Sequence, residues 1–125
     1  MPIDERLKEG IQLFNNQQFF ECHEIIENLW LETKDESRNF LKGLIQAAVA
    51  VHHFKKENLS GALGLYKSST QYLSSYSATY SGVNAEKLIR GLNVCFRELV
   101  QADDGATIQI REELIPKIQF EETLG

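Results

Sequence analysis

The residues with the clearest chemical potential stand one turn apart in a helix predicted over residues 17–33. The spacing i, i+4 between His23 and Glu27 brings an imidazole and a carboxylate to the same side of that helix. The same side carries an apolar arc, made of Phe19, Cys22, Ile26 and Trp30. A carboxylate desolvated among apolar neighbours is costly unless it is paired, protonated or placed at the mouth of a cleft. His23, one turn earlier, is the nearest candidate partner for Glu27.

A second set of polar residues follows on the next predicted helix. Gln46 and His53 are spaced i, i+7 and fall on the margin of its apolar face. If the two helices pack as neighbours, four polar side chains converge: His23, Glu27, Gln46 and His53. They would form either a buried hydrogen-bond network that fixes the helix register or a site that meets a ligand or a water molecule. Trp30 would be a core anchor that also walls such a site.

Two further interpretations give the same residues a catalytic or metal-binding role. In a hydrolase, Glu27 or Glu24 would be the general base, and the histidines would act as ligands or acid–base groups. A metal site would need His23 and Glu27 together with His53 or His52, although His52 fits a structural role better. The zinc peptidase motif H-E-x-x-H is absent, because Glu27 stands where its second His belongs. No cofactor is predicted, and the sequence leaves open whether the protein is an enzyme.

The elements that must position these residues are helices, because the apolar periodicity is helical throughout and no strand is indicated. We expect an all-α bundle of five helices built from helical hairpins around a central, largely apolar third helix. The helices are predicted to start at or near Asp4, Gln17, Asp35, Asn58 and Asn84. Residues 74–83, rich in Ser and Tyr, should form a loop. The tail over 106–125 is interrupted by Pro116 and forms either a sixth helix or a segment packed on the bundle.

The composition limits the class of protein. A chain of 125 residues fits a single domain over 1–125 and can fold without metals or disulfides. The net charge of −5 and the scattered basic residues give nucleic acid little to bind. The longest apolar run, residues 47–51, is too short to cross a membrane, and no secretory signal is evident. We therefore expect a cytoplasmic protein in which Cys22 and Cys95 are reduced and largely buried.

Several of these residues also carry a family resemblance. The pattern His-Glu-x-x-Glu-x-x-Trp over 23–30, the run Phe-Leu-Lys-Gly-Leu-Ile-Gln-Ala-Ala over 40–48, and then His53, Asn58 and Gly61-Ala62 resemble the family called domain of unknown function 309. The resemblance is close over about residues 10–75. It implies a small all-helical domain, found mainly in bacteria and archaea, with no established activity. Lys42 departs from the pattern, which more usually has Gln there.

The leading functional hypothesis is a binding or scaffolding domain, with a protein partner, self-association as a homo-oligomer or an unspecified small molecule as its ligand. The first alternative is the hydrolase described above. The second is a peptide-binding module like a tetratricopeptide repeat. It rests on a weak internal repeat, in which Phe19 and Cys22 correspond to Leu59 and Ala62 forty residues later.

Overall fold

Five helices make up most of the computed structural model, which describes residues 3–103 and 105–121. They are α1 (Glu5–Asn15), α2 (Phe19–Glu32), α3 (Arg38–Lys55), α4 (Leu59–Ser74) and α5 (Ala85–Gln101). A short hairpin of β1 (Thr79–Tyr80) and β2 (Val83–Asn84) links α4 to α5, and a single 3₁₀ turn, η1 (Glu112–Leu114), lies in the C-terminal segment. The predicted all-α single-domain bundle is confirmed. No helix of the described residues is long and apolar enough to span a membrane.

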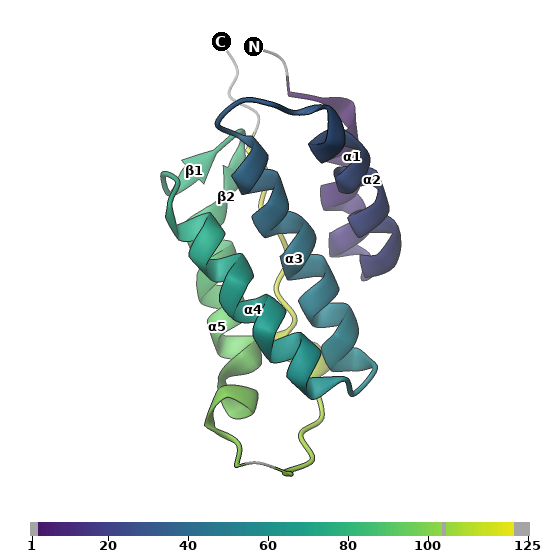
Figure 1. Cartoon of the computed structure of the whole chain (residues 1–125), viewed down its shortest axis with the longest axis vertical. Helices are drawn as coiled ribbons and strands as arrows, with labels where there is room; N and C mark the ends of the chain where they lie inside the picture. The colour runs from purple at the N-terminus through teal and green to yellow at the C-terminus, as the bar shows by residue number, and fades with distance from the viewer. Residues whose placement is uncertain (1–2, 104, 122–125) are drawn as a thin grey trace.

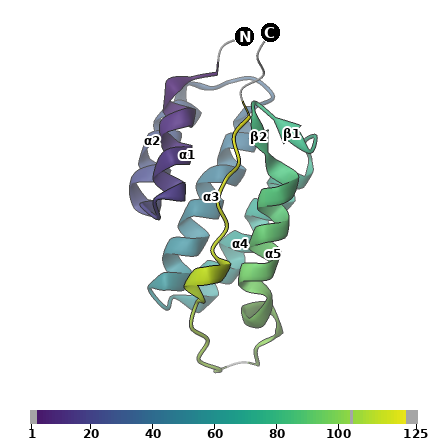
Figure 2. The same ribbon diagram turned by 180° about the vertical axis from the view of Figure 1, so that it is seen from behind.

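The helices form two layers, as Figures 1 and 2 show from opposite sides. The helices α2, α3 and α4 form one layer, and α1 and α5 form the other with the C-terminal segment running between them. Helix α3 packs against both α2 and α4. It buries an apolar set that extends around most of the helix: Phe40, Leu41, Gly43, Leu44, Ala47, Ala48, Ala50, Val51 and Phe54. The prediction that the third helix is central is confirmed.

Helices α3 and α4 approach each other closely at Gly43. A Cβ atom at this position would lie 2.8 Å from the side chain of Leu73, so only glycine fits without a shift of α4. The hydroxyl of Ser69, which is fully buried, donates a hydrogen bond of 2.7 Å to the carbonyl oxygen of Gly43. This contact fixes the α3–α4 hairpin and leaves the opposite side of α3 to α2.

Three of the predicted helix starts are confirmed by side-chain caps. Asp4 accepts from the backbone N–H of Arg6, and Asn58 and Asn84 accept from the N–H groups two or three residues into their helices. The prediction for Asp35 is wrong, because α3 begins only at Arg38. The carboxylate of Asp35 instead accepts from the N–H and the hydroxyl of Ser37, which closes a turn before the helix.

The prediction that the chain has no strand is wrong at one place. Within the loop predicted over 74–83, Thr79 pairs with Asn84 and Tyr80 with Val83 in an antiparallel hairpin. The two residues of its turn, Ser81 and Gly82, both have positive φ angles, 50° and 79°. Such a turn suits the twist of a hairpin, but two residues a strand leave no alternating pattern to detect in the sequence.

The C-terminal tail takes the second of the two forms predicted for it. No sixth α-helix forms in 106–121, and the single turn η1 is followed by extended chain that packs on the bundle. Pro116 lies in this extended part, where its fixed φ and missing N–H are tolerated. Ile118 is buried to 3% exposure and joins the apolar core. Residues 122–125 of the predicted tail lie outside the described residues.

Candidate functional site

The predicted pair on α2 forms. The Nε2 atom of His23 lies 3.0 Å from a carboxylate oxygen of Glu27. The two side chains are 26% and 46% exposed, so the pair lies at the surface of the bundle. Because Nε2 faces the carboxylate, the proton of a neutral imidazole belongs on Nε2, which leaves Nδ1 as a hydrogen-bond acceptor.

Three buried polar atoms near this pair have no hydrogen-bond partner among the described residues. They are Nδ1 of His23, Nε1 of Trp30 and Oε1 of Gln46. Leaving a buried donor or acceptor unpaired costs about 1–3 kcal/mol. Such a group in a native protein calls for an explanation, because the great majority of buried polar atoms are paired.

The register of α2 against α3 aligns these three residues. At one end of the seam, the ring centroids of Phe20 and His52 are 6.1 Å apart. Toward the other end, Nζ of Lys42 lies 5.5 Å from the ring centroid of Trp30. The two helices are antiparallel, so Gln46, one turn beyond Lys42, is level with the part of α2 between His23 and Trp30. All three residues with an unpaired atom therefore belong to one seam.

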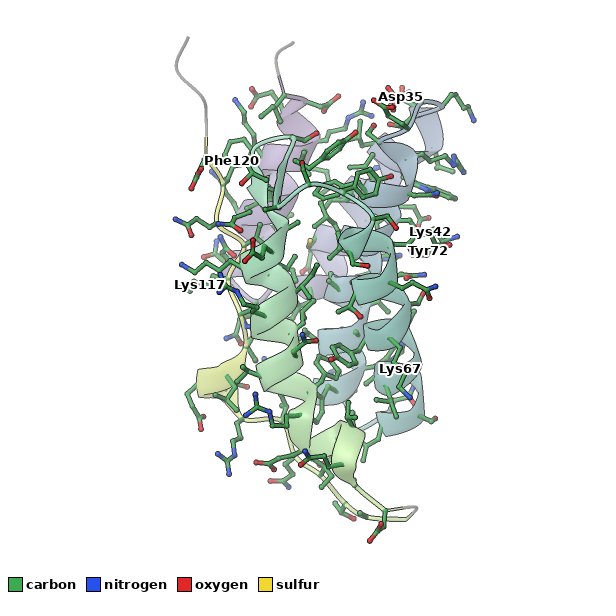
Figure 3. All side chains as sticks on the ribbon, turned by 90° about the vertical axis from the view of Figure 1, so that its left-hand side faces the viewer. Asp35, Lys42, Lys67, Tyr72, Lys117 and Phe120 are labelled. Atoms are coloured by element: carbon green, nitrogen blue, oxygen red, sulfur yellow. The ribbon has the colours of Figure 1, made fainter. Side chains whose placement is uncertain are left out.

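Two cationic side chains, Arg38 and Lys42, lie near the ring of Trp30. The guanidinium carbon of Arg38 lies 3.8 Å from the ring centroid, a cation–π contact. The ammonium of Lys42 lies between two rings, 5.5 Å from that of Trp30 and 5.9 Å from that of Tyr72 on α4. Figure 3 shows Lys42 and Tyr72 close together on the side of the molecule opposite Lys117 and Phe120. Two cationic side chains thus lie against aromatic rings at the Trp30 end of the seam.

His53 makes a different contact from the one predicted with His23, Glu27 and Gln46. Its Nδ1 atom lies 3.3 Å from the side-chain amide of Asn58, the residue that caps α4. His52 lies closer to the pair than the sequence indicated, because Phe20 packs against the rings of both His23 and His52. Burial, followed by the charges of His53 and Lys56, lowers the pKa of His52. Pattern reasoning missed Phe20 and His52, since nothing in the spacing of one helix gives its register against another.

The metal interpretation gains no geometric support from the described residues. In residues 3–103 and 105–121, no three His, Cys, Asp or Glu side chains are grouped so that they could hold a metal ion, and this includes His23, Glu27 and His53. Glu24, the other candidate base, is exposed. Both cysteines are buried, and burial raises the pKa of Cys22 and of Cys95 to about 12, which keeps the thiols protonated and unreactive.

The chain is similar to one family model and to two uncharacterized proteins. Residues 7–65, just under half of the chain, match the model of the family "Domain of unknown function (DUF309)". An uncharacterized protein of Aquifex aeolicus (strain VF5) is 32% identical over 81 residues, which cover 64% of this chain and 24% of that protein. The uncharacterized protein YpuF of Bacillus subtilis (strain 168) is 36% identical over 64 residues, which cover 50% of this chain and 37% of that protein. The chain therefore spans well under half the length of both relatives.

Proposed function

We propose that this chain, which carries a DUF309 domain over residues 7–65, is a binding protein whose α2–α3 seam holds a ligand with an amide group. The observation that carries the proposal is the set of three buried, unpaired polar atoms on His23, Trp30 and Gln46. They belong to the seam that also carries the pair of His23 and Glu27, whose side chains are 26% and 46% exposed. A ligand that pairs with these atoms removes part of the free-energy cost of leaving them unpaired.

The chemistry of the three atoms selects the ligand class. The indole Nε1–H of Trp30 can only donate, and Oε1 of Gln46 can only accept. Nδ1 of His23 accepts while the proton of Nε2 faces Glu27. A ligand that serves all three must both donate and accept, which an amide does and a carboxylate does not. Peptides and small amides share this chemistry, so the ligand source is either a protein partner or a small molecule.

The surroundings of the seam fit such a ligand. Phe20 and Leu31 on α2 are 52% and 55% exposed, although both are large apolar residues. They offer apolar contacts on the helix that carries His23 and Trp30, and most ligand sites combine such surface with a few convergent polar groups. Binding is favoured over hydrolysis because Glu27, a proposed base, is already paired with His23, and both cysteines are buried.

Trp30 is the only tryptophan of the chain, so its fluorescence reports directly on the seam. The protein is titrated with N-acetyl-leucinamide, and separately with isocaproate, which has a similar apolar tail but only a carboxylate. We expect a saturable change in emission with the amide and none with the carboxylate. Peptides blocked at both ends and longer than one residue then test a protein partner against a small-molecule ligand by their affinity.

Two variants provide the test of the site. Gln46→Met keeps the size of the side chain but removes the acceptor, and we expect it to weaken amide binding by about tenfold. Gln71→Met, at an exposed position on α4, is the matched control and should bind as the wild type does. Equal responses to the amide and to isocaproate, or unchanged binding by Gln46→Met, would contradict the proposal.

A further inference from the structure

In the layer of α1 and α5, a C-terminal segment of the chain itself lies between the two helices. Residues 111–121, which we refer to as the strap, run between α1 and α5 and pass across α3 (Figure 2). We refer to the surface that the strap covers as the strap groove. Of the strap residues, Ile118 is the one that is buried, while Leu114, Ile115, Pro116 and Phe120 are half-buried. The strap, which is extended after η1, is therefore laid on the helices with few of its own side chains inside the core.

One wall of the groove recognises the main chain of the strap. The side-chain amide of Asn15, at the end of α1, donates to the carbonyl oxygen of Ile118 at 2.9 Å. The backbone N–H of Ile118 donates to Oδ1 of Asn15 at 2.7 Å. This two-point contact engages the peptide unit itself, so it does not depend on which chain supplies the segment.

The opposite wall recognises the main chain as a strand does. The N–H of Asn84 donates to the carbonyl oxygen of Gln119 at 2.9 Å, and the N–H of Glu121 donates to that of Gly82. Val83 and Phe120 form an antiparallel bridge. The strap thus adds one β-bridge to the edge of the β1–β2 hairpin, in the manner of β-augmentation, a mode of peptide recognition.

Two glycines shape the groove for particular side chains of the strap. A Cβ atom at Gly91 on α5 would lie 2.6 Å from Cβ of Pro116. A Cβ atom at Gly82 would lie 2.8 Å from the ring of Phe120. Together with the pocket that buries Ile118, the groove selects the pattern Pro-x-Ile-x-Phe over residues 116–120.

The strap is also separable from the bundle. Residues 102–111, which lead into the strap from α5, contain no helix or strand in their described part, and 103, 105–107 and 109 are exposed. A cleft of about 500 Å³ opens beside the strap, lined by Ile11, Asn15, Ile118, Phe120 and two further residues of α1. Apart from Ile118, the buried apolar core comes from residues before 100, and Leu114, Ile115 and Phe120 of the strap pack against it from outside.

We propose that this groove is a binding site for an extended segment of another protein with the pattern Pro-x-Ile-x-Phe, and that the strap occupies it when no such partner is bound. The site is independent of the α2–α3 seam, which lies on the other layer. A tethered segment acts at a high effective concentration, so a partner must bind more tightly than the strap or meet a chain whose strap is released.

The test separates the strap from its tether without removing it. A protease recognition sequence is inserted between Gly105 and Ala106, and the folded full-length protein is cleaved there. A fluorescent peptide of residues 109–121 is then added to the cleaved, unseparated protein and followed by fluorescence anisotropy. We expect the peptide to exchange with the cleaved strap, an excess of unlabelled peptide to compete, and a scrambled peptide to fail.

Variants on both sides locate the binding. Ile118→Asp in the peptide should lower the affinity by about tenfold or more, because it places a carboxylate in an apolar pocket. Asn15→Leu in the cleaved protein should have an effect of similar size, because it removes both hydrogen bonds to the Ile118 peptide unit. The peptide with Lys117→Ala, at an exposed position, and the protein with Gln71→Leu on α4 are the matched controls and should leave it unchanged. Uncleaved protein should take up the labelled peptide at least about tenfold more weakly, since its own strap competes.

Three results would overturn the proposal. Loss of the helical circular dichroism signal on cleavage would make the strap an essential part of the fold. Equal binding of the scrambled peptide would remove the specificity. A dimer of the uncleaved chain with exchanged straps, detected by native mass spectrometry, would assign the groove to a second copy of this chain rather than to a foreign segment.

Discussion

The strap groove and the α2–α3 seam differ in whether their polar groups are paired. In the strap groove, the amide of Asn15 satisfies both polar groups of the Ile118 peptide unit, and the groove's other wall adds further backbone hydrogen bonds. In the α2–α3 seam, buried atoms of His23, Trp30 and Gln46 have no partner among the described residues. The same chain therefore contains one site that is filled by its own segment and one whose hydrogen-bonding groups remain available.

Paired and unpaired buried groups affect the stability of the fold differently. A paired buried group stabilises the fold, so its loss should lower the free energy of unfolding. An unpaired buried group destabilises the fold, and its retention needs a reason outside folding, such as a ligand. Substitutions in the two regions should consequently differ in sign, and each prediction below tests one side of that contrast.

The largest effect is expected at Ile118 in the strap. Ile118→Ala removes the strap's buried apolar side chain and should lower the free energy of unfolding by about 2 kcal/mol or more. Urea denaturation followed by circular dichroism measures this. Ile110→Ala, at a half-buried position just before the strap, is the control and should cost clearly less. Equal losses for the two variants would mean that the groove does not hold Ile118 specifically.

A somewhat smaller loss is expected at Asn15. Asn15→Leu leaves the N–H and the carbonyl oxygen of Ile118 without their partner, which should cost about 1–3 kcal/mol in the same denaturation experiment. Asn16→Leu, at the exposed neighbouring position, serves as the comparison. An unchanged midpoint for Asn15→Leu would remove the contrast between the two layers.

Gly91→Ala should loosen the strap with little change in overall stability. Alanine favours the helix by about 1 kcal/mol, but its Cβ would lie 2.6 Å from Pro116, and overpacking costs about 1–3 kcal/mol. We expect faster hydrogen exchange of the Ile118 N–H than in the wild type, measured by NMR. Gly64→Ala, where a Cβ meets nothing within 4 Å, should leave that exchange rate unchanged.

The smallest effect is a dependence of the free energy of unfolding on pH near neutrality. It should arise at α2 and α3, because all three histidines lie on these helices. Burial, His53, Lys56 and His23 lower the pKa of folded His52, whereas Glu21 opposes them. The unfolded chain therefore binds a proton more readily, and stability should fall as the pH decreases from about 7 through the unfolded-state value near 6.5. His52→Gln should flatten this slope in urea denaturation at several pH values. A slope that His52→Gln leaves intact would show that another group causes it.

The sequence predicted the helical part of this account well and the strap poorly. Spacing within one helix is enough to pair His23 with Glu27, because the helix itself sets the distance. The contact between Phe20 and His52 depends on how two helices align, which local patterns do not contain. The contact between Asn15 and Ile118 joins residues 103 positions apart, through a segment with no periodic signal. The hairpin could not be predicted, because strands of two residues are too short to show an alternating pattern.

We claim that the α2–α3 seam keeps unpaired polar atoms for a ligand and not for the fold. The free energy of unfolding of Gln46→Met tests this. Replacing the unpaired acceptor with an apolar side chain of similar size should leave stability unchanged or raise it by about 1 kcal/mol, measured by urea denaturation of the ligand-free protein. A loss of about 1 kcal/mol or more would show that Gln46 has a structural partner and would contradict the claim.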